Sequence, residues 1–577
     1  MRAVPFALVL LAVGVLYFVG LGSAPFFDPS EGFHAQIART MAEGGDWVTP
    51  HVNGVRYFDK PPLLYWLMAA SFRVVAPGEA AARFWPAVAA LGVVAVTMRL
   101  GMVLANARVG LLAGLFTAAN LGIFLYARIV KTDLLFILCI MLALLGFAVA
   151  YLGGGRRALA LFWLGLGLAA LSKDVLGALG PLVAVALFFW VVREPHVARW
   201  APWWGVGLLL AVTVPWYAAV EWRNHGFLWY TLIDNHVLNL ARRRVFPDED
   251  VPLSGLVFLA VTLVAFLPWT LALPPALARA FRGRRSAARE RLWVLFAIWP
   301  LLVIGFFALS PFKLPNYGLP AFPVLALLVA RVWDETLEDG AEAPRPRVLM
   351  LPVLVFCVAV AAAFLLAAAG QLSVPSGAMT SVDVATRNLA ARGRHVAQAP
   401  LEAYAGIIVR CATVFALASF ALALAVWRRW PAAGVGAAVA GMLAFLPIAG
   451  EGMAQFGRTR AALPVTEALL REARPDDAVV FEGPLENNGS VLLALGRHVR
   501  VVDGLQSNLA FGATFPEARD VFWDAGRFRV EWTRPGRRFL VSALPPDRSV
   551  VGTLPPGTVR LITRGGGRYL YASVAGR

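Results

Sequence analysis

Charged residues are scarce in this chain, and their scarcity argues against a water-soluble fold. Of the 577 residues, 15% are Asp, Glu, Lys or Arg and 59% are hydrophobic, whereas soluble domains average about 25% charged residues. Cysteine is also rare, since only Cys139, Cys357 and Cys411 occur. All three lie in apolar runs, which indicates small buried side chains rather than a disulfide framework. We therefore expect an integral membrane protein without redox chemistry.

The sequence also lacks the motifs of several common enzyme classes. No HExxH or CxxC pairing occurs, so spacing predicts no high-affinity zinc site. No GxSxG turn precedes a helix, which disfavours a Ser-His-Asp hydrolase. The net charge of +17 would suggest nucleic acid in a soluble protein, but here the arginines cluster between apolar runs and indicate membrane anchoring. We expect no nucleic-acid partner.

Apolar runs that approach the length needed to cross about 30 Å of hydrocarbon fill most of residues 1–450. We expect a polytopic α-helical membrane protein with about thirteen transmembrane helices, followed at residues 451–577 by a small α/β domain. The first run lacks a small-residue cleavage site and is expected to be retained as a helix. The runs lie at 5–22, 84–105, 109–126, 134–152, 158–172, 175–192, 202–220, 254–274, 293–309, 318–332, 348–369, 402–426 and 432–449.

The gaps between these runs alternate between arginine-rich segments and segments with few arginines. The positive-inside rule places the arginine-rich gaps, such as Arg156–Arg157 and the Arg279–Arg291 cluster, in the cytoplasm. The other gaps are then outside, and they hold almost all residue types suited to chemistry. These outer gaps are 23–83, 127–133, 172–174, 221–253, 310–317, 370–401 and the tail from residue 450.

The first outer gap is too long and too patterned for a simple connector. An amphipathic stretch runs from Pro29 to Met41, with Ser30 as the expected N-cap, and a second begins at Pro61 and continues through Leu67. We expect both to form helices that lie in the membrane interface.

Lysine is the rarest charged residue, because only four of the 52 basic residues are lysines and all four lie in the outer gaps. A compact ammonium is a good point-charge partner for phosphate, so the four indicate a site for an anionic lipid headgroup. Each lysine alone could instead extend to the interface. Asp59, Asp133 and Asp174 lie close to three of them in sequence, and Asp133 begins a helix, where its carboxylate could also serve only as a cap. The lysines are Lys60, Lys131, Lys173 and Lys313.

Three segments of the first outer gap carry a family resemblance, namely 29–41 (PSEGFHAQIARTM), 45–50 (GDWVTP) and 57–66 (YFDKPPLLYW). They closely resemble the first periplasmic loop of bacterial GT-C glycosyltransferases, in the branch of the protein O-mannosyltransferases and the lipid A aminoarabinose transferase. Two later segments agree with the same family: 131–133 (KTD) and 313–320 (KLPNYGLP). Asn235–His236 looks like a degraded Glu-His motif of this family. The resemblance covers about residues 1–330.

The resemblance implies an inverting transfer of a sugar from a polyprenyl-phosphate carrier, with an acidic residue of the first loop near the reacting centre. The family usually has Asp followed by Glu there, whereas this chain has Ser30 and Glu31, and Phe33 replaces an Arg. Glu31 is therefore the first candidate for the catalytic carboxylate and Asp28 the runner-up. Asp133 and Asp59 are expected to complete an acidic pocket. The expected substrate-binding residues are Lys60, Lys131, Lys173, Lys313, Tyr317, His236 and Arg242.

Several alternatives stay open at this point. A divalent metal between Asp59 and His236 is one of them, and a lipid-linked oligosaccharide ligase or polymerase would use the same carrier. A transporter is disfavoured because ionisable residues avoid the centres of the apolar runs, and a non-catalytic relative is suggested only by Ser30. The expected partners are a polyprenyl-phosphate sugar, a lipid, glycan or protein acceptor, and the bilayer. The expected location is the bacterial inner membrane, with the active site and C-terminus in the periplasm.

Overall fold

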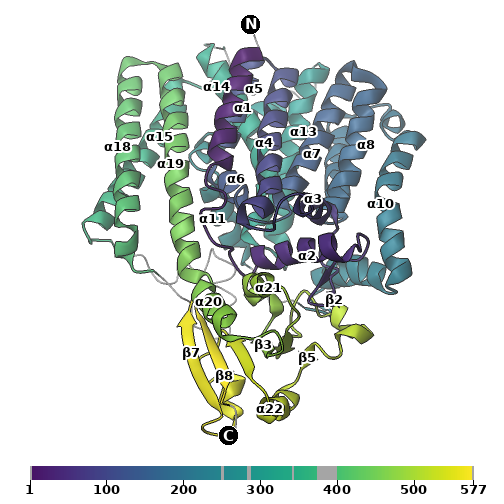
Figure 1. The fold of residues 1–577 in the computed structure, drawn as a ribbon. Helices are drawn as coiled ribbons and strands as arrows, with labels where there is room; N and C mark the ends of the chain where they lie inside the picture. Colours follow the sequence, from purple (N-terminus) through teal and green to yellow (C-terminus); the bar gives the residue numbers. More distant parts are fainter. Residues whose placement is uncertain are drawn as a thin grey trace.

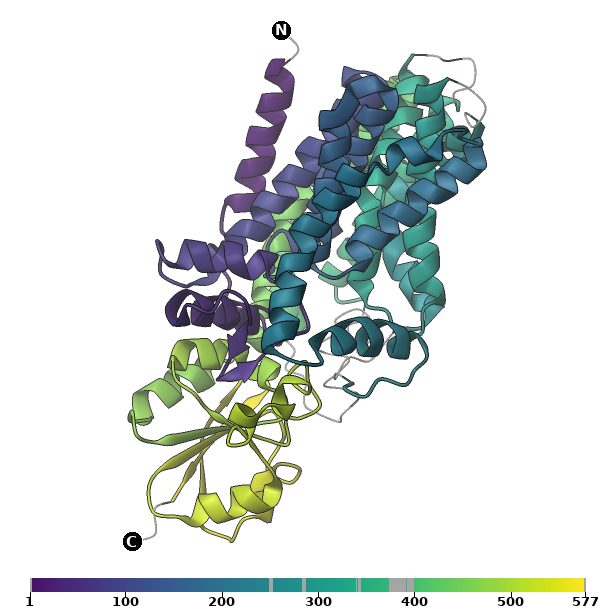
Figure 2. The same ribbon diagram turned by 90° about the vertical axis from the view of Figure 1, so that its right-hand side faces the viewer.

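Long helices run side by side and carry a small mixed sheet at one end (Figure 1). The computed structural model describes residues 3–247, 253–282, 287–338, 340, 344–372, 391 and 399–574. The N-terminus lies at the end of the bundle opposite to the sheet, and α1 stands at the margin of the bundle (Figure 2). Most of the expected outer gap 370–401 and part of the Arg279–Arg291 cluster fall outside the described residues.

Each of the thirteen expected apolar runs contains a helix. The runs 109–126 and 254–274 are interrupted, the first because the side chain of Asn120 accepts a hydrogen bond from Ile123 N and starts a new helix. The helices are α1 (Ala3–Phe18), α4 (Glu79–Leu104), α5 (Ala107–Ala118), α6 (Leu121–Tyr126), α7 (Asp133–Val149), α8 (Gly155–Ser172), α9 (Leu176–Val192), α10 (Trp203–Arg223), α11 (Gly255–Ala265), α12 (Leu273–Arg282), α13 (Ala288–Leu309), α14 (Phe322–Leu337), α15 (Pro346–Ala368), α18 (Ala405–Arg428) and α19 (Pro431–Arg460).

Fewer than thirteen helices of the described residues are individually long and apolar enough to cross a membrane. Among the described residues, eight helical stretches are long and apolar enough, or nine if α11 and α12, which are bent by 97°, form one broken span. One of the eight is the stretch Asp133–Ser172, in which Gly153 adopts a φ of 96° and separates α7 from α8. The helices α1, α5 and α9 are apolar but shorter. The multi-pass helical membrane fold is confirmed, while the count of thirteen is reached only with these shorter helices.

Exposed tryptophans mark the two edges of the apolar belt. Trp203 at the start of α10 is 85% exposed and Trp222 near its end is 81% exposed. A helix rises about 1.5 Å per residue, so the two side chains are about 28 Å apart along the axis, close to the ~30 Å thickness of the hydrocarbon core. Amphipathic indole rings prefer this boundary region. The helix α10 therefore crosses a bilayer from one edge to the other.

Two short helices of the first loop lie between the bundle and the sheet (Figures 1 and 2). They are α2 (Glu31–Gly44) and α3 (Leu63–Phe72), which confirms the two amphipathic stretches, with a hairpin of β1 (His51–Val52) and β2 (Val55–Arg56) between them. The expected N-cap role of Ser30 is wrong. Its backbone is already helical, at φ −101° and ψ −60°, and its side chain makes no capping hydrogen bond. The hydroxyl points instead to Val130 O, at 3.5 Å.

The C-terminal sheet has six strands in the order β5-β4-β3-β6-β8-β7. Strands β3 to β6 pair in parallel, while β8 pairs antiparallel with β6 and β7. The expected small α/β domain is present, although α19 continues to Arg460, so the boundary at residue 450 stays a proposal. The elements are α20 (Leu463–Glu472), β3 (Ala478–Glu482), α21 (Gly489–Leu495), β4 (Arg500–Val502), β5 (Phe522–Trp523), α22 (Ala525–Thr533), β6 (Arg538–Ser542), β7 (Val559–Gly565) and β8 (Arg568–Ser573).

Candidate active site

Asp133 anchors a buried group of charges at the first residue of α7. Its Oδ1 accepts hydrogen bonds from Lys173 Nζ at 2.7 Å and from Asn316 Nδ2 at 2.8 Å. The ammonium of Lys173 also lies 4.8 Å from the ring centroid of Tyr317, a favourable cation–π distance. Asp133 is 5% exposed, so its charge depends on these partners. Three outer segments that are distant in sequence therefore meet at this carboxylate.

Asp59 and Lys60 form a second pair, in the first loop. Lys60 Nζ lies 2.5 Å from Asp59 Oδ2. Burial alone would raise the pKa of Asp59, but Lys60, together with Arg244 and His34, outweighs it and lowers the pKa below its usual value. Asp59 is therefore a carboxylate at neutral pH.

His34 on α2 connects these two pairs electrostatically. Its Nδ1 lies 2.8 Å from the hydroxyl of Tyr65. Burial, together with the charges of Lys60 and Lys131, lowers the pKa of His34 to about 3, although Asp59 and Asp133 act in the opposite direction. The imidazole is therefore neutral at neutral pH and lies within the field of four charged groups. We call the set His34, Asp59, Lys60, Lys131, Asp133, Lys173, Asn316 and Tyr317 the lysine cluster.

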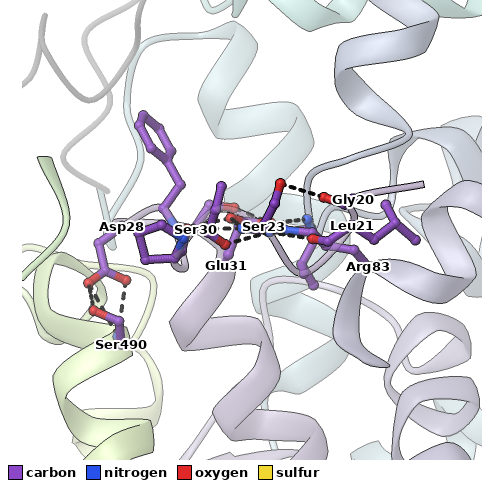
Figure 3. A network of polar contacts seen from close by, with 12 residues as sticks. Gly20, Leu21, Ser23, Asp28, Ser30, Glu31, Arg83 and Ser490 are labelled. Atoms are coloured by element: carbon purple, nitrogen blue, oxygen red, sulfur yellow. Dashed lines mark hydrogen bonds and ion pairs between the residues drawn. The ribbon is translucent and has the colours of Figure 1, made fainter. Parts of the chain in front are cut away.

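Glu31 belongs to a neighbouring network that is almost completely closed (Figure 3). Arg83 donates to both carboxylate oxygens, at 2.8 and 2.6 Å, and the backbone amides of Phe27 and Val130 each donate at 2.9 Å. Glu31 is 1% exposed and Arg83 is 3% exposed. Arg83 also donates to three carbonyls of the preceding loop. Glu31 can accept a proton from an acceptor hydroxyl only if one of these donors moves, so its role as the base stays a prediction.

Asp28 faces the C-terminal domain rather than the lysine cluster. Its carboxylate accepts hydrogen bonds from the backbone amide and the hydroxyl of Ser490 (Figure 3) and lies 3.7 Å from the guanidinium of Arg568. Burial raises the pKa of Asp28 to about 6, although Arg568 and Ser490 oppose this effect and Glu31 adds to it. Asp28 thus connects the first loop to the sheet.

The other three expected substrate-binding residues make different contacts. Lys313, which is 5% exposed, donates to Ala308 O at 3.0 Å near the end of α13. His236 Nδ1 lies 2.6 Å from Thr231 O, within a π-helix from Trp229 to Leu238 rather than in a loop. Arg242 is exposed and has a φ of 58°. No group of three or more His, Cys, Asp or Glu residues within the described ranges could hold a metal ion.

Sequence reasoning missed several residues that the site uses. Arg83 and Asn316 are the partners of Glu31 and Asp133, but they lie 52 and 183 positions away from them. His34 lies in the segment 29–41 that carries the family resemblance, but no role was assigned to it. Its position one helical turn after Glu31 on a predicted interfacial helix was the available signal.

The sequence of this chain is similar to that of several known proteins. Residues 59–218 match the family described as dolichyl-phosphate-mannose-protein mannosyltransferase. The chain is 34% identical over 363 residues to an undecaprenyl phosphate-alpha-4-amino-4-deoxy-L-arabinose arabinosyl transferase of Pseudomonas aeruginosa, and 29% identical over 337 residues to the enzyme of that name from Aeromonas salmonicida. These alignments cover 59% and 57% of this chain, and 61% and 60% of the relatives. The chain thus spans about three fifths of the length of these curated relatives.

The crystal structure of ArnT from Cupriavidus metallidurans bound to undecaprenyl phosphate decides the fold. It matches over 100% of both chains with a TM-score of 0.80 at 23% sequence identity. The apo structure of the same protein matches with the same TM-score at 24% identity. This chain has the GT-C fold. The resemblance to the mannosyltransferase and aminoarabinose transferase branch is confirmed.

The matched family region coincides with the charged part of the lysine cluster. Residues 59–218 contain all five of its charged members, Asp59, Lys60, Lys131, Asp133 and Lys173. Asp28 and Glu31 lie just before this region, and Lys313 lies well after it. The family match therefore includes the charged part of the lysine cluster, while the alignments with the relatives extend well beyond it.

Proposed function

We propose that this GT-C protein is a glycosyltransferase that moves a sugar from a polyprenyl-phosphate carrier to an acceptor hydroxyl. The lysine cluster carries this proposal, because Lys60, Lys131, Asp59 and Asp133 act on one neutral imidazole and a third lysine, Lys173, pairs with Asp133. Ammonium groups suit the phosphate of the carrier. Carboxylates suit the activation of the attacking hydroxyl.

The chemistry needs few groups. The leaving group is a lipid phosphate, whose departing charge can be held by fixed cations, so no strong acid is required. We assign this task to Lys60, Lys131 and Lys173, with Tyr317, Lys313, His236 and Arg242 as further contacts to donor or acceptor. The acceptor hydroxyl loses its proton to a carboxylate during attack, so that the bond from sugar to phosphate breaks as the bond from sugar to acceptor forms.

The carboxylate is proposed from the set Glu31, Asp133, Asp59 and Asp28. Asp59 and Asp133 lie in the cluster itself, each beside a lysine. Glu31 lies next to it, since its oxygen binds the amide of Val130, the residue before Lys131. Asp28 is the most remote, because its partners are in the C-terminal domain.

We further propose 4-amino-4-deoxy-L-arabinose as the sugar and lipid A as the acceptor. The sugar is the one in the names of the similar transferases, and lipid A follows from the family resemblance. We place the lysine cluster and the C-terminal domain on the periplasmic face of a bacterial inner membrane. The arginine-rich gaps support this orientation, and a reporter fused after residue 577 is expected to be active only in the periplasm.

The test is a transfer assay with the purified chain. Undecaprenyl-phosphate aminoarabinose and lipid A are supplied together, and mass spectrometry follows the gain of one sugar on the acceptor. Transfer to lipid A supports the full proposal, and transfer only to protein or to another glycan corrects the acceptor. Binding of the carrier without transfer to any of these acceptors would contradict the proposed activity.

A further inference from the structure

The parallel strands of the C-terminal sheet end at one edge of the sheet, and this edge faces the first loop. Strand β3 ends at Glu482 and leads into α21, which packs against α2. Strand β4 ends at Val502 and leads into the segment that contains Phe511. In open α/β sheets this edge normally forms the crevice that binds ligands. Here it is covered by the loop that carries Asp28, Glu31 and Asp59 (Figure 1).

Two glycines bring the backbones of α2 and α21 into direct contact. A Cβ atom on Gly32 would lie 2.2 Å from Ser490 N, and one on Gly489 would lie 2.3 Å from Phe33 N. Both distances are far shorter than any van der Waals contact, and the obstructing atoms belong to the backbone. The two helices can pack in this way only while both positions lack a side chain.

Polar contacts close the same interface on both sides of the glycines. Asp28 accepts hydrogen bonds from Ser490 and lies beside Arg568, which is 9% exposed. Asn53 exchanges two hydrogen bonds with the backbone of Val499, at 2.9 and 2.8 Å. These contacts are buried and join positions more than four hundred residues apart in the sequence.

Aromatic rings fix the part of the loop next to Asp59. The ring of Phe58 lies 5.2 Å from that of Phe511, and Phe511 stacks on Tyr230 at 4.6 Å with an interplanar angle of 6°. Phe58 directly precedes Asp59 and Lys60, so its position constrains theirs. The C-terminal domain thus holds the first loop at two separate points.

We propose that the C-terminal domain is a positioning clamp, in which Gly489 and Ser490 hold the start of α2 and Phe511 holds Phe58, so that the first-loop carboxylates keep their place beside the lysine cluster. This inference rests on the proposed function, because it treats those carboxylates as parts of an active site. The residues of the clamp are positioning residues, since they act through α2 and Phe58 rather than on substrate.

The test compares glycine substitutions that differ only in their surroundings. Gly489→Ala and Gly32→Ala insert a methyl group into the interface. Gly44→Ala, at the end of the same helix α2, meets no atom within 4 Å and has an ordinary φ, so it is the matched control. Ser490→Ala removes the hydroxyl that binds Asp28 without adding bulk. This variant replaces the glycine variants in the test if those do not fold. Hydrogen exchange of residues 28–44 and transfer kinetics are measured on the full-length protein.

We expect faster exchange across residues 28–44 in both interface variants, because a loosened helix opens more often. The kcat for transfer should fall about 10²-fold, as expected for a misplacement of about 1 Å, while the KM for the donor stays within about twofold. Ser490→Ala should change exchange and kcat in the same direction by a smaller factor. Gly44→Ala should match the parent in all three measurements.

Unchanged exchange in Gly489→Ala would show that no clamp exists. Faster exchange with a parental kcat would show that the contact holds α2 but does not position the site, and a raised donor KM with a parental kcat would make the domain a binding surface instead. Each of these results overturns the inference. A failure of the proposed function would give a different result. The parent protein would then transfer no sugar, while hydrogen exchange would still show whether the contact holds α2.

Discussion

The two ends of the helical bundle bury charge in different ways. At the end remote from the sheet, Arg331 is paired with Glu290 and Glu335 at 2.7 and 2.9 Å, and Arg108 lies 3.2 Å from Asp334. At the other end, the cations next to Asp59 and Asp133 are lysines, while Glu31 beside them is paired with Arg83. Arg331 at the first end and Asp133 at the second are each 5% exposed, so both ends hold buried charge.

The choice of cation separates structure from function. Arginine offers a rigid planar fork that holds carboxylates in one geometry, whereas lysine is a point charge on a flexible stem that can exchange one anion for another. The chain contains four lysines among 52 basic residues, and three of them lie in the cluster. We infer that the arginine end fastens helices together, while the lysine end is built to exchange a carboxylate for a lipid phosphate.

The largest effect is expected from removing the charge of the catalytic carboxylate. Asp59→Asn, Asp133→Asn and Glu31→Gln keep the shape of each side chain, and the variant at the base should lose a factor of about 10² to 10⁴ in kcat. Glu31→Gln should also lose about 3–5 kcal/mol of stability, because Arg83 would stay buried without its partner. Transfer rates and thermal melts of the purified variants provide the measurement. Parental rates in all three variants would exclude these three carboxylates and leave Asp28 as the remaining member of the proposed set.

Substitutions at the arginine end should lower the stability of the protein but leave the rate of transfer unchanged. Arg331→Ala removes the buried partner of Glu290 and Glu335, which keep Arg279 at 3.7 and 3.1 Å. The loss of these charged hydrogen bonds should cost about 1.5–3 kcal/mol in the free energy of unfolding. The kcat of the fraction that remains folded should be that of the parent. Denaturant unfolding in detergent and an activity assay normalised to folded protein check both statements. A specific loss of kcat at this end would erase the contrast between the two ends.

A smaller effect concerns Asp28, which sits between the two parts of the molecule. Burial raises the pKa of Asp28 to about 6 from 3.8. A carboxyl group with a raised pKa in the folded state contributes stability that is complete below the unfolded pKa and is lost as the pH rises through the folded pKa. The parent should therefore lose stability relative to Asp28→Asn between about pH 4 and pH 7. A stability difference that does not change across this range would show that Asp28 does not titrate with a raised pKa.

Much of the fold could be predicted because apolar runs report helices directly. Every expected run contains a helix, and the small α/β domain expected after residue 450 corresponds to the mixed sheet and its helices. Sorting the gaps by arginine content predicted that Lys60, Lys131 and Lys173 lie on one side of the membrane. In the structure Lys173 pairs with Asp133 and Lys60 pairs with Asp59. The arginine content of a gap predicts the side of the membrane on which a lysine lies, but not the atom that the lysine binds. Lys313 was therefore predicted together with the other lysines, and the structure shows that it donates to Ala308 O.

Contacts set by tertiary packing could not be predicted. Arg83 lies at the edge of an apolar run and gave no sign that it would enclose Glu31. Serine is a residue type that favours the N-cap position. The backbone of Ser30 is already helical, however, and its hydroxyl points to Val130 O in another segment. Gly32 and Gly489 are ordinary among 52 glycines until the two helices are placed against each other.

The affinity for undecaprenyl phosphate tests the central claim most directly. Hydrogen bonds to charged groups contribute about 1.5–3 kcal/mol, so Lys60→Ala and Lys173→Ala should each weaken binding by about tenfold to a hundredfold. Lys313→Ala should have a smaller effect, and Arg108→Ala at the arginine end is the control that should leave affinity unchanged. Parental affinity in both cluster variants would show that the lysine end does not bind the carrier phosphate.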